Sequence, residues 1–250
     1  MTLYLCSVSQ KLIEEAVDYL YSWGWKKVTY RECLYKREGV APQRLAALRV
    51  INPQSSSLND TPYPLEIDFE KRKIKECRCG RGSIYSGMHL SRVLGALLKP
   101  EEGKISSLPV FITPDYIATW DSADLRWHLR YAVFGMPTLI SLTGIVEAPA
   151  RPREVYLGKS LGFQESFLEE KFKGDFLTPE DERLGRVLAG ILLQTIFYFH
   201  TGEPFCRDKE CSLWNSHWQK ELIKAQDDVP YTLCPLHERK WKEIIKERGN

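Results

Sequence analysis

The chain has 250 residues, of which 43% are hydrophobic and 27% are charged, and its formal net charge is +2. These proportions are typical of a folded globular protein and exclude a disordered chain, because enough apolar surface is available for a core. The small net charge excludes a strong overall field toward nucleic acid or an anionic membrane. The longest apolar run, residues 187–199, is shorter than the about 20 residues that a membrane span needs.

The N-terminus and the cysteines indicate the cellular compartment. The first ten residues, MTLYLCSVSQ, contain neither a charged segment nor an apolar segment of signal-peptide length, so we expect a cytoplasmic protein without a membrane anchor. Seven cysteines in that compartment indicate thiols or metal ligands first, because stable disulfides are uncommon there.

The N-terminal part predicts a strand, helix, strand unit. Residues 3–8 form the first predicted strand, and residues 9–24 carry apolar side chains at helical spacing. Ser9 is suited to cap this helix and Gly24 to end it. A second strand at residues 27–31 completes the unit, which favours a parallel or mixed sheet.

The middle of the chain predicts further strands and helices. The segment PLEIDFEKRKI (64–74) alternates apolar and acidic residues, which predicts a half-buried strand, and residues 83–98 predict a helix. Two apolar strands are predicted at 108–112 and 138–146, joined through an amphipathic stretch around residues 125–134.

The motif TPEDE predicts that a buried helix begins at Thr178 and Pro179, runs to about His200 and stops at Gly202. We therefore predict an α+β (mixed α/β) fold, in which helices cover a mixed, twisted sheet. The predicted main domain comprises residues 1–202, and a C-terminal zinc-binding subdomain comprises residues 203–250.

Four side chains of the kinds that bind structural zinc lie in the C-terminal segment. Cys206 and Cys211 are separated by four residues, and Cys234 and His237 by two. Because Cys234 precedes Pro235 at a predicted helix start, His237 falls in the first helical turn, where it can share an ion with Cys234. We predict that these four residues bind one structural Zn²⁺, whose binding energy helps a small segment to fold.

Two alternatives to this site remain open. The cluster could consist of three buried thiols and an unrelated surface histidine. His217 is the rival fourth ligand, although a packing or hydrogen-bonding role is favoured for it.

The segments CRDKECSL and CPLH resemble the C-terminal part of the archaemetzincins, a family of zincin-fold metallopeptidases. In this comparison Leu213 replaces the family's methionine, and His237 replaces its last cysteine. Upstream, LPVFITPD, RYAVFG and ISLTGI are similar to the family's sheet strands, and YSGMHLSRVLGALL is similar to its preceding helix. The resemblance extends over residues 81–250 and implies a zincin or metzincin-like fold.

The same resemblance implies that a catalytic metal has been lost. The family's motif HExxHxxGxxHC, placed backward from Cys206, puts its three histidines and its glutamate on other residue types. These positions are Thr195, Ile196, Phe199 and Phe205, and only the glycine remains, as Gly202. Threonine and phenylalanine at i and i+4 keep the helical spacing but cannot ligate zinc, and isoleucine cannot act as the general base. His200 is one position away from the required place, about 100° around the helix.

From these residues we expect a zinc-binding, archaemetzincin-like protein that is catalytically inactive and has a peptide-binding or scaffold role. One alternative is an active zinc metallopeptidase with other ligands. Another is a zinc module that binds nucleic acid through the basic stretch Lys71–Arg81. Because Glu70 and Glu76 flank this stretch, a solvated sheet edge is favoured and nucleic acid is not an expected partner.

The remaining cysteines have no assigned role in the sequence. Cys77 and Cys79 could form a second metal site or a disulfide with Cys33 or Cys6, but simple packing is favoured.

Overall fold

The predicted strand, helix, strand unit is confirmed in the structure, which is a computed structural model that describes residues 1–76, 82–227 and 231–248. Strand β1 (Thr2–Leu5) is followed by helix α1 (Gln10–Ser22) and strand β2 (Thr29–Arg31), and the two strands pair in parallel. The combination of helices with mixed sheets confirms the α+β class. No helix within the described residues is long and apolar enough to cross a membrane.

The chain forms two compact units. Unit 1 contains residues 1–9 and 27–148, and unit 2 contains residues 10–26 and 149–250. Helix α1 therefore belongs to unit 2, although the strands before and after it belong to unit 1. The domain division predicted at residue 202 stays a prediction.

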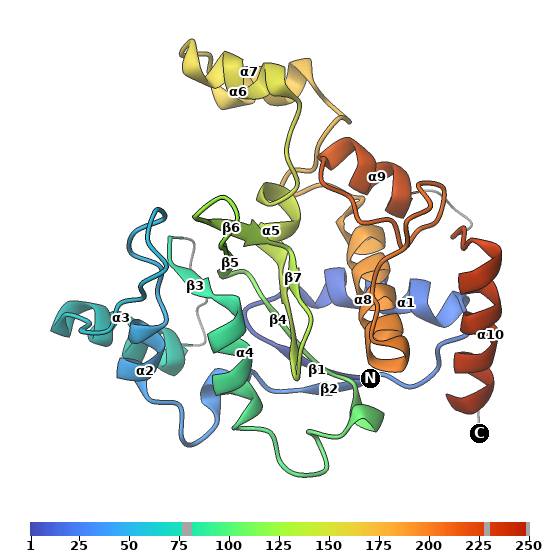
Figure 1. The fold of residues 1–250 in the computed structure, drawn as a ribbon, viewed down its shortest axis with the longest axis horizontal. Coiled ribbons are helices and arrows are strands. Elements are labelled where there is room, and N and C mark those ends of the chain that lie inside the picture. The colour runs from blue at the N-terminus through green and yellow to red at the C-terminus, as the bar shows by residue number, and fades with distance from the viewer. Residues whose placement is uncertain (77–81, 228–230, 249–250) are drawn as a thin grey trace. The chain divides into compact units, whose positions relative to one another are not determined.

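Unit 1 is built on a five-stranded sheet with the order β2-β1-β4-β8-β7, and Figure 1 shows β1 and β4 near its middle. The first four strands of this order are parallel, and β7 runs antiparallel to β8. Every residue of β4 and β8 is buried, as expected of strands covered on both faces. Besides β1 and β2, this sheet contains β4 (Pro109–Thr113), β7 (Ala132–Val133) and β8 (Thr138–Ser141).

A second sheet in unit 1 has the order β3-β5-β6, with β3 parallel and β6 antiparallel to β5. Its strands are β3 (Ile84–Ser86), β5 (Tyr116–Asp121) and β6 (Arg126–Arg130). The helices of unit 1 are α2 (Pro42–Ala47), α3 (Pro64–Glu76), α4 (Gly87–Gly95) and α5 (Leu142–Glu147), with short 3-10 turns η1 (Leu34–Lys36) and η2 (Ile105–Ser107).

Helix α3 corrects the predicted strand at residues 64–74. Of the apolar residues that produced the alternating pattern, Leu65 is 81% exposed, and Ile67 and Phe69 are only half-buried. The buried side chains of α3 are instead Glu70 and Lys73, three residues apart on one helical face. The prediction was wrong because the fully buried side chains of α3 are charged, so the apolar pattern did not mark its inward side.

Three other boundaries also differ from the predictions. Residues 84–86 of the predicted helix 83–98 form β3, and residues 142–146 of the predicted strand 138–146 belong to α5. The long buried helix begins at Leu184 rather than at Thr178, because residues 178–183 form a turn in which Arg183 binds the Asp181 carboxylate. In both places the strand leads directly into the helix, after Ser86 and after Ser141, without an intervening loop.

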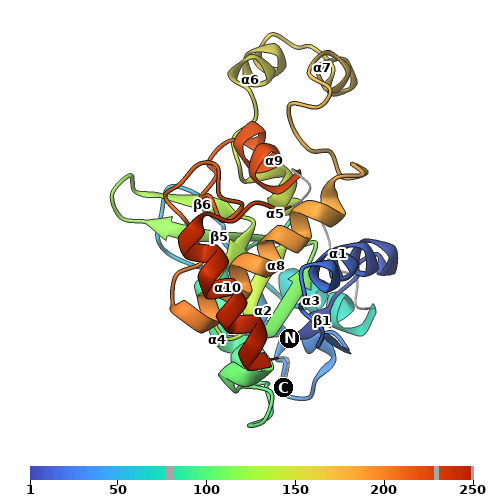
Figure 2. The same cartoon turned by 90° about the vertical axis from the view of Figure 1, so that its right-hand side faces the viewer.

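Unit 2 is helical, and its centre is α8 (Leu184–Thr201). Helix α1 packs on α8. Helix α10 (Pro235–Arg248) also lies next to α8 (Figures 1 and 2), and the rings of Phe197 in α8 and Trp241 in α10 stack with their centroids 6.0 Å apart. The predicted stop of α8 is confirmed, since Gly202 adopts a left-handed conformation with φ 77°. The other helices of unit 2 are α6 (Arg153–Ser160), α7 (Glu165–Lys171) and α9 (Gln219–Asp227).

A buried ion pair ties α3 to the carboxyl end of β4 within unit 1. Lys73 Nζ lies 2.6 Å from Asp115 Oδ2, and both side chains are almost completely shielded from solvent. Lys73 Nζ also donates to the Tyr85 hydroxyl at 2.9 Å, and that hydroxyl donates to Glu70 Oε1 at 2.5 Å. The hydroxyl of Tyr35 donates to Asp115 Oδ2 at 3.2 Å. Burial raises the pKa of the Glu70 carboxyl above its ordinary value, which favours its neutral form.

Replacing Lys73 with methionine should strongly destabilise the protein, because it leaves the Asp115 charge buried without its partner. Removing one member of a buried pair costs about 3–5 kcal/mol of unfolding free energy, measurable by urea denaturation. The matched control is Lys71→Met, whose exposed ammonium pairs with Asp68, and its unfolding midpoint should remain near that of the wild type. Equal effects of the two substitutions would contradict the role assigned to the buried pair.

A second ion pair in unit 1 makes stability depend on pH. The Arg37 guanidinium donates to both carboxylate oxygens of Glu102, at 2.5 and 2.7 Å. These hydrogen bonds lower the pKa of Glu102 from 4.5 to about 2. Because the folded-state pKa is depressed, the pair stabilises the fold above pH 4.5 and loses this contribution as the pH falls toward 2.

The variant Glu102→Gln should therefore lose stability at neutral pH and approach the wild type in acid. The difference between the two unfolding free energies should be constant above pH 4.5 and should shrink as the pH falls toward 2. The control is Glu101→Gln at the exposed neighbouring carboxyl. A Glu102→Gln deficit that stays constant down to pH 2 would show that the carboxylate charge is not responsible.

Candidate metal centre

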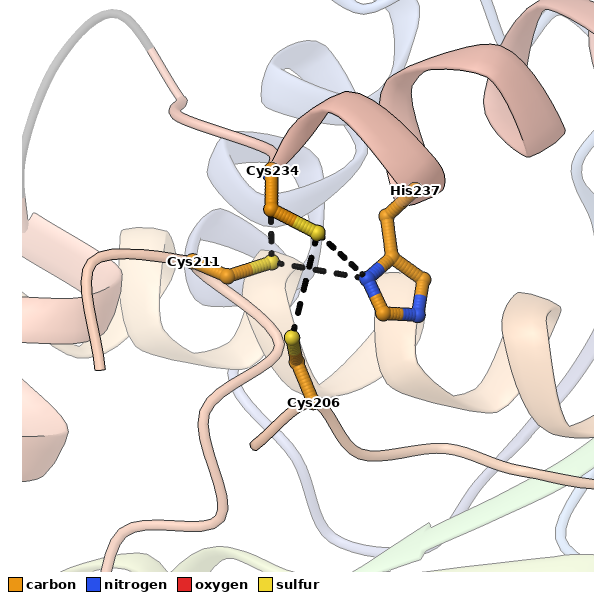
Figure 3. A group of neighbouring side chains, drawn as sticks. All are labelled: Cys206, Cys211, Cys234 and His237. Atoms are coloured by element: carbon orange, nitrogen blue, oxygen red, sulfur yellow. Dashed lines mark hydrogen bonds between the residues drawn. The ribbon is translucent and has the colours of Figure 1, made fainter. Parts of the chain in front are cut away.

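The four predicted zinc ligands come together in unit 2. Cys206, Cys211, Cys234 and His237 each offer one ligand atom, and these four atoms all lie within 4.8 Å of one another. Figure 3 shows the three sulfur atoms and the imidazole ring turned toward one common point. The side chains of Cys206, Cys211 and His237 are buried, and that of Cys234 is half-buried.

The separations fit a tetrahedral metal site. Cys206 Sγ and Cys234 Sγ are 3.9 Å apart, and Cys211 Sγ and His237 Nδ1 are 3.8 Å apart. Cys234 Sγ and His237 Nδ1 are closer, at 3.1 Å. Sulfur ligands about 2.3 Å from a tetrahedral ion are separated by roughly 3.8 Å. The cluster could therefore hold one metal ion with small adjustments of the side chains.

A short loop that follows α8 positions the first two cysteines. The Cys206 amide donates to the Leu213 carbonyl at 2.7 Å, and the Cys211 amide donates to the Asp208 carbonyl at 3.2 Å. The Asp208 amide in turn donates to Cys206 Sγ at 3.3 Å. These contacts close the loop, so that both sulfur atoms reach the same point.

The N-terminus of α10 positions Cys234 and His237, as the sequence predicted. Helix α10 starts at Pro235, directly after Cys234, and His237 lies in its first turn. The Glu238 amide donates to the Cys234 carbonyl at 2.9 Å, which is the first hydrogen bond of the helix. The His237 ring also meets the Phe197 ring of α8 edge-on at 5.3 Å. The cluster is thereby packed against the central helix of unit 2.

A glycine in α8 allows a polar contact that supports the cysteine loop. A Cβ atom at Gly190 would overlap the Gln226 side chain, so α8 and α9 approach closely only because this residue is glycine. Gln226 Nε2 donates to the Ser212 carbonyl at 2.7 Å, next to Cys211. The Ser212 amide donates to Thr232 O at 2.8 Å and connects the two ligand-bearing segments.

Electrostatics favour the neutral forms of the ligands when no cation is bound. Burial raises the pKa of the Cys211 thiol to about 12 and also raises the pKa of the Cys206 thiol. Burial, together with the nearby Lys240 ammonium, lowers the pKa of His237 and favours the neutral imidazole that binds metals. A divalent cation must therefore displace thiol protons, and its affinity should rise with pH.

The residues at the positions of the archaemetzincin catalytic motif offer no metal ligand in α8. The Thr195 hydroxyl is fully buried and donates to the Ile191 carbonyl one turn earlier, at 2.9 Å. Ile196 is also fully buried. Phe199 and Phe205 are half-buried, and a phenylalanine side chain has no ligand atom.

The other histidines near α8 lie outside the four-residue cluster. His217 is exposed and contributes no atom to the group, and its backbone amide donates to Glu221 Oε2 at 3.1 Å. His200 lies in the last turn of α8 and is not part of the group either.

A second group of ligand types, which the sequence analysis did not predict, lies at the β5–β6 hairpin in unit 1. Asp121, Asp124 and His128 offer ligand atoms within 4.8 Å of one another. His128 Nε2 and Arg126 Nε both lie 2.7 Å from Asp124 Oδ2, so a cationic side chain already occupies this carboxylate. The spacing D-x-x-D-x-x-x-H at residues 121–128 is the sequence signal that could have identified it.

The described part of the basic stretch Lys71–Arg81 is helical and does not form a sheet edge. Its described part lies in α3, where Lys73 and Glu70 are buried and Lys71 pairs with Asp68 at 2.8 Å. The remainder, residues 77–81, lies outside the described residues, and so do Cys77 and Cys79. Lys73 is therefore not available to contact a phosphate.

The structure describes two of the cysteines that the sequence left without a role. Cys33 is a buried thiol. Cys6 is disulfide-bonded, so the simple packing favoured for these cysteines is wrong at this residue, and the disulfide left open as an alternative is present.

Comparison with protein families gives one match that spans almost the whole chain. The model described as "Probable metallopeptidase family (DUF6775)" matches residues 1–244, so the chain belongs to this family. No curated protein and no solved structure matches the chain. Membership of a metallopeptidase family suggests a bound metal. Among the described residues, the cluster of Cys206, Cys211, Cys234 and His237 could hold one.

Cys211→Ser should abolish metal retention, because Cys211 is the most deeply buried sulfur ligand and its hydroxyl replacement is a poor ligand for soft divalent ions. The measurement is metal content per chain by elemental analysis, supported by the sulfur-to-metal absorption of the Co²⁺ form. His217→Ala is the matched control and should retain the metal. Retention by Cys211→Ser together with loss in His217→Ala would mean that the ligand set is wrong.

Proposed function

We propose that the chain is a zinc-binding, archaemetzincin-like member of its family, in which Cys206, Cys211, Cys234 and His237 hold one structural Zn²⁺. The observation that carries this proposal is the convergence of three sulfur atoms and one imidazole at tetrahedral spacing. Thiolate and imidazole ligands suit zinc better than magnesium or calcium, which take oxygen ligands. Four protein ligands close the coordination sphere, as in structural rather than catalytic zinc sites.

We further propose that the protein has no peptidase activity. A catalytic zinc needs protein ligands and one open position for water. In α8 the two places at i and i+4 carry Thr195, whose hydroxyl is bound to the Ile191 carbonyl, and Phe199, which has no ligand atom. Ile196 cannot accept a proton from a metal-bound water. The proposal therefore describes a metallopeptidase homologue that keeps a structural ion and lacks catalytic machinery.

The proposed role is to bind a peptide or protein partner beside the cluster. A groove of about 660 Å³ is lined by Gly202, Phe205 and Trp214 together with the ligands Cys206 and His237. Lys240 and Arg207 also line it and could bind carboxylates. Apolar walls with a few charged groups are typical of peptide-binding sites. Nucleic acid and membrane partners are not part of this proposal.

An active metallopeptidase is the second candidate function, and Asp121, Asp124 and His128 are the residues that favour it. Two carboxylates and one imidazole can leave positions open for water on a bound metal. The ion pair of Arg126 with Asp124 counts against this function, because the ion would have to displace it.

Measuring both metal content and cleavage distinguishes the two functions. The protein, purified without added metal and again after excess zinc and desalting, should contain one zinc per chain, and it should cleave neither casein nor fluorogenic peptides. The enzymatic function would replace the proposed one if the protein held two metals per chain and cleaved peptides in a chelator-sensitive way. In that case His128→Asn should abolish cleavage, and Cys211→Ser should lower cleavage only in proportion to the loss of folded protein.

A further inference from the structure

The cluster of Cys206, Cys211, Cys234 and His237 contains a pair of sulfur atoms that can react with each other. Cys206 Sγ lies 3.9 Å from Cys234 Sγ, and Figure 3 draws the line between them. A disulfide bond is about 2 Å long, so an approach of roughly 2 Å joins the two atoms. Cys206 belongs to the loop after α8 and Cys234 directly precedes α10, so this bond connects the loop to the helix start.

Solvent access separates this pair from the third cysteine of the cluster. Cys211 is fully buried, whereas Cys234 is half-buried. Cys206 lines the groove of about 660 Å³ beside the cluster, although little of its side chain is exposed. A small oxidant can therefore reach Cys234 from the surface and Cys206 from the groove, while Cys211 is shielded.

A bound metal prepares both accessible sulfur atoms for oxidation. A thiol that coordinates a metal ion is deprotonated, and the thiolate is the reactive form of cysteine. Sensitivity to oxidation follows thiolate character and exposure, and a sensitive cysteine often lies next to a second cysteine that completes the disulfide. Cys206 and Cys234 meet these conditions when the cluster holds Zn²⁺, so the inference rests on the proposed function.

We propose that the cluster is a redox switch, in which hydrogen peroxide joins Cys206 to Cys234 by a disulfide bond and releases the metal ion. The Cys234 thiolate, which is the more exposed, attacks one peroxide oxygen, so that an S–O bond forms, the O–O bond breaks and hydroxide leaves. The Cys206 thiolate then attacks this sulfur, so that the S–S bond forms, the S–O bond breaks and a second hydroxide leaves. The two sulfur atoms lose two electrons, and the peroxide gains them.

The metal ion leaves because oxidation removes two of its four ligands. Cys211 and His237 alone do not complete a structural zinc site, which has four protein ligands. The new disulfide keeps the loop after α8 attached to the start of α10 once the ion has left. His237 is released from the ion and lines the same groove as Cys206, so the zinc-bound and the oxidised protein present different groove walls to a partner.

The test is oxidation of the purified full-length wild type by hydrogen peroxide, followed by measurement of zinc release and of disulfide bonds. One zinc ion per chain should be released, and a dithiol together with added zinc should restore it. After the remaining thiols are blocked, trypsin should yield peptide 187–207 bonded to peptide 225–239. Cleavage at the intervening lysines and arginines places Cys206 and Cys234 in these two peptides and Cys211 in peptide 210–220.

The possible failures of the switch and of the zinc site can be told apart. Zinc that stays bound while peroxide oxidises free cysteine in the same solution would overturn the switch, as would zinc release with a disulfide that includes Cys211. A wild type that contains no zinc before oxidation would overturn the proposed function as well. The matched control is Cys33→Ala, which removes a buried thiol in unit 1 and should release zinc as fast as the wild type. Slower release by this variant would assign the reaction to Cys33 and contradict the switch.

A melting experiment checks the role of the disulfide. The oxidised, zinc-free protein should unfold at a higher temperature than the reduced protein from which a chelator has removed the zinc, because a disulfide restricts the unfolded chain. Equal unfolding midpoints would mean that oxidation does not tie the loop after α8 to α10, and the switch would then be wrong.

Discussion

The buried ion pair of Lys73 and Asp115 attaches helix α3 to the carboxyl end of strand β4 in unit 1. Both charges are removed from water, so their attraction alone does not offset the cost of desolvation. The hydroxyls of Tyr35 and Tyr85 supply the additional hydrogen bonds that such a pair needs. Helix α2 packs on α3 and is therefore connected to the same contact. A buried charged contact thus stabilises the position of α3, whereas apolar packing positions most other elements of the chain.

The proximity of Cys206, Cys211, Cys234 and His237 could be predicted from the sequence because most of the geometry of this cluster is local. Cys206 and Cys211 belong to one tight loop, and Cys234 and His237 belong to one helical turn that begins at a proline. Only one non-local step remained, the meeting of the loop with the helix start. Cysteine and histidine also have few alternative roles when they occur in pairs. The contribution of Gly190 through Gln226 could not be predicted, since it depends on how closely two helices approach.

The central strands and the end of α8 were also predictable because their signals are local in the sequence. Helix α3 was not predictable in this way. Its alternating apolar residues gave the periodicity of a strand, yet the side chains that face inward are Glu70 and Lys73. Their partner Asp115 lies far away in sequence, and hydrophobic periodicity contains no information about such a pair. The group at Asp121, Asp124 and His128 was missed because exposed acidic residues near turns are common in surface loops.

The place of α1 has a consequence for the synthesis of the protein. Its apolar face, with Ile13, Val17 and Leu20, packs on α8, which follows it by most of the length of the chain. A ribosome therefore releases α1 long before the helix that will cover it exists. Until residues 184–201 have emerged, that face is exposed to other apolar surfaces in the cell. Chains that terminate before α8 would keep it exposed permanently, which makes truncated products of this protein candidates for aggregation and for capture by chaperones.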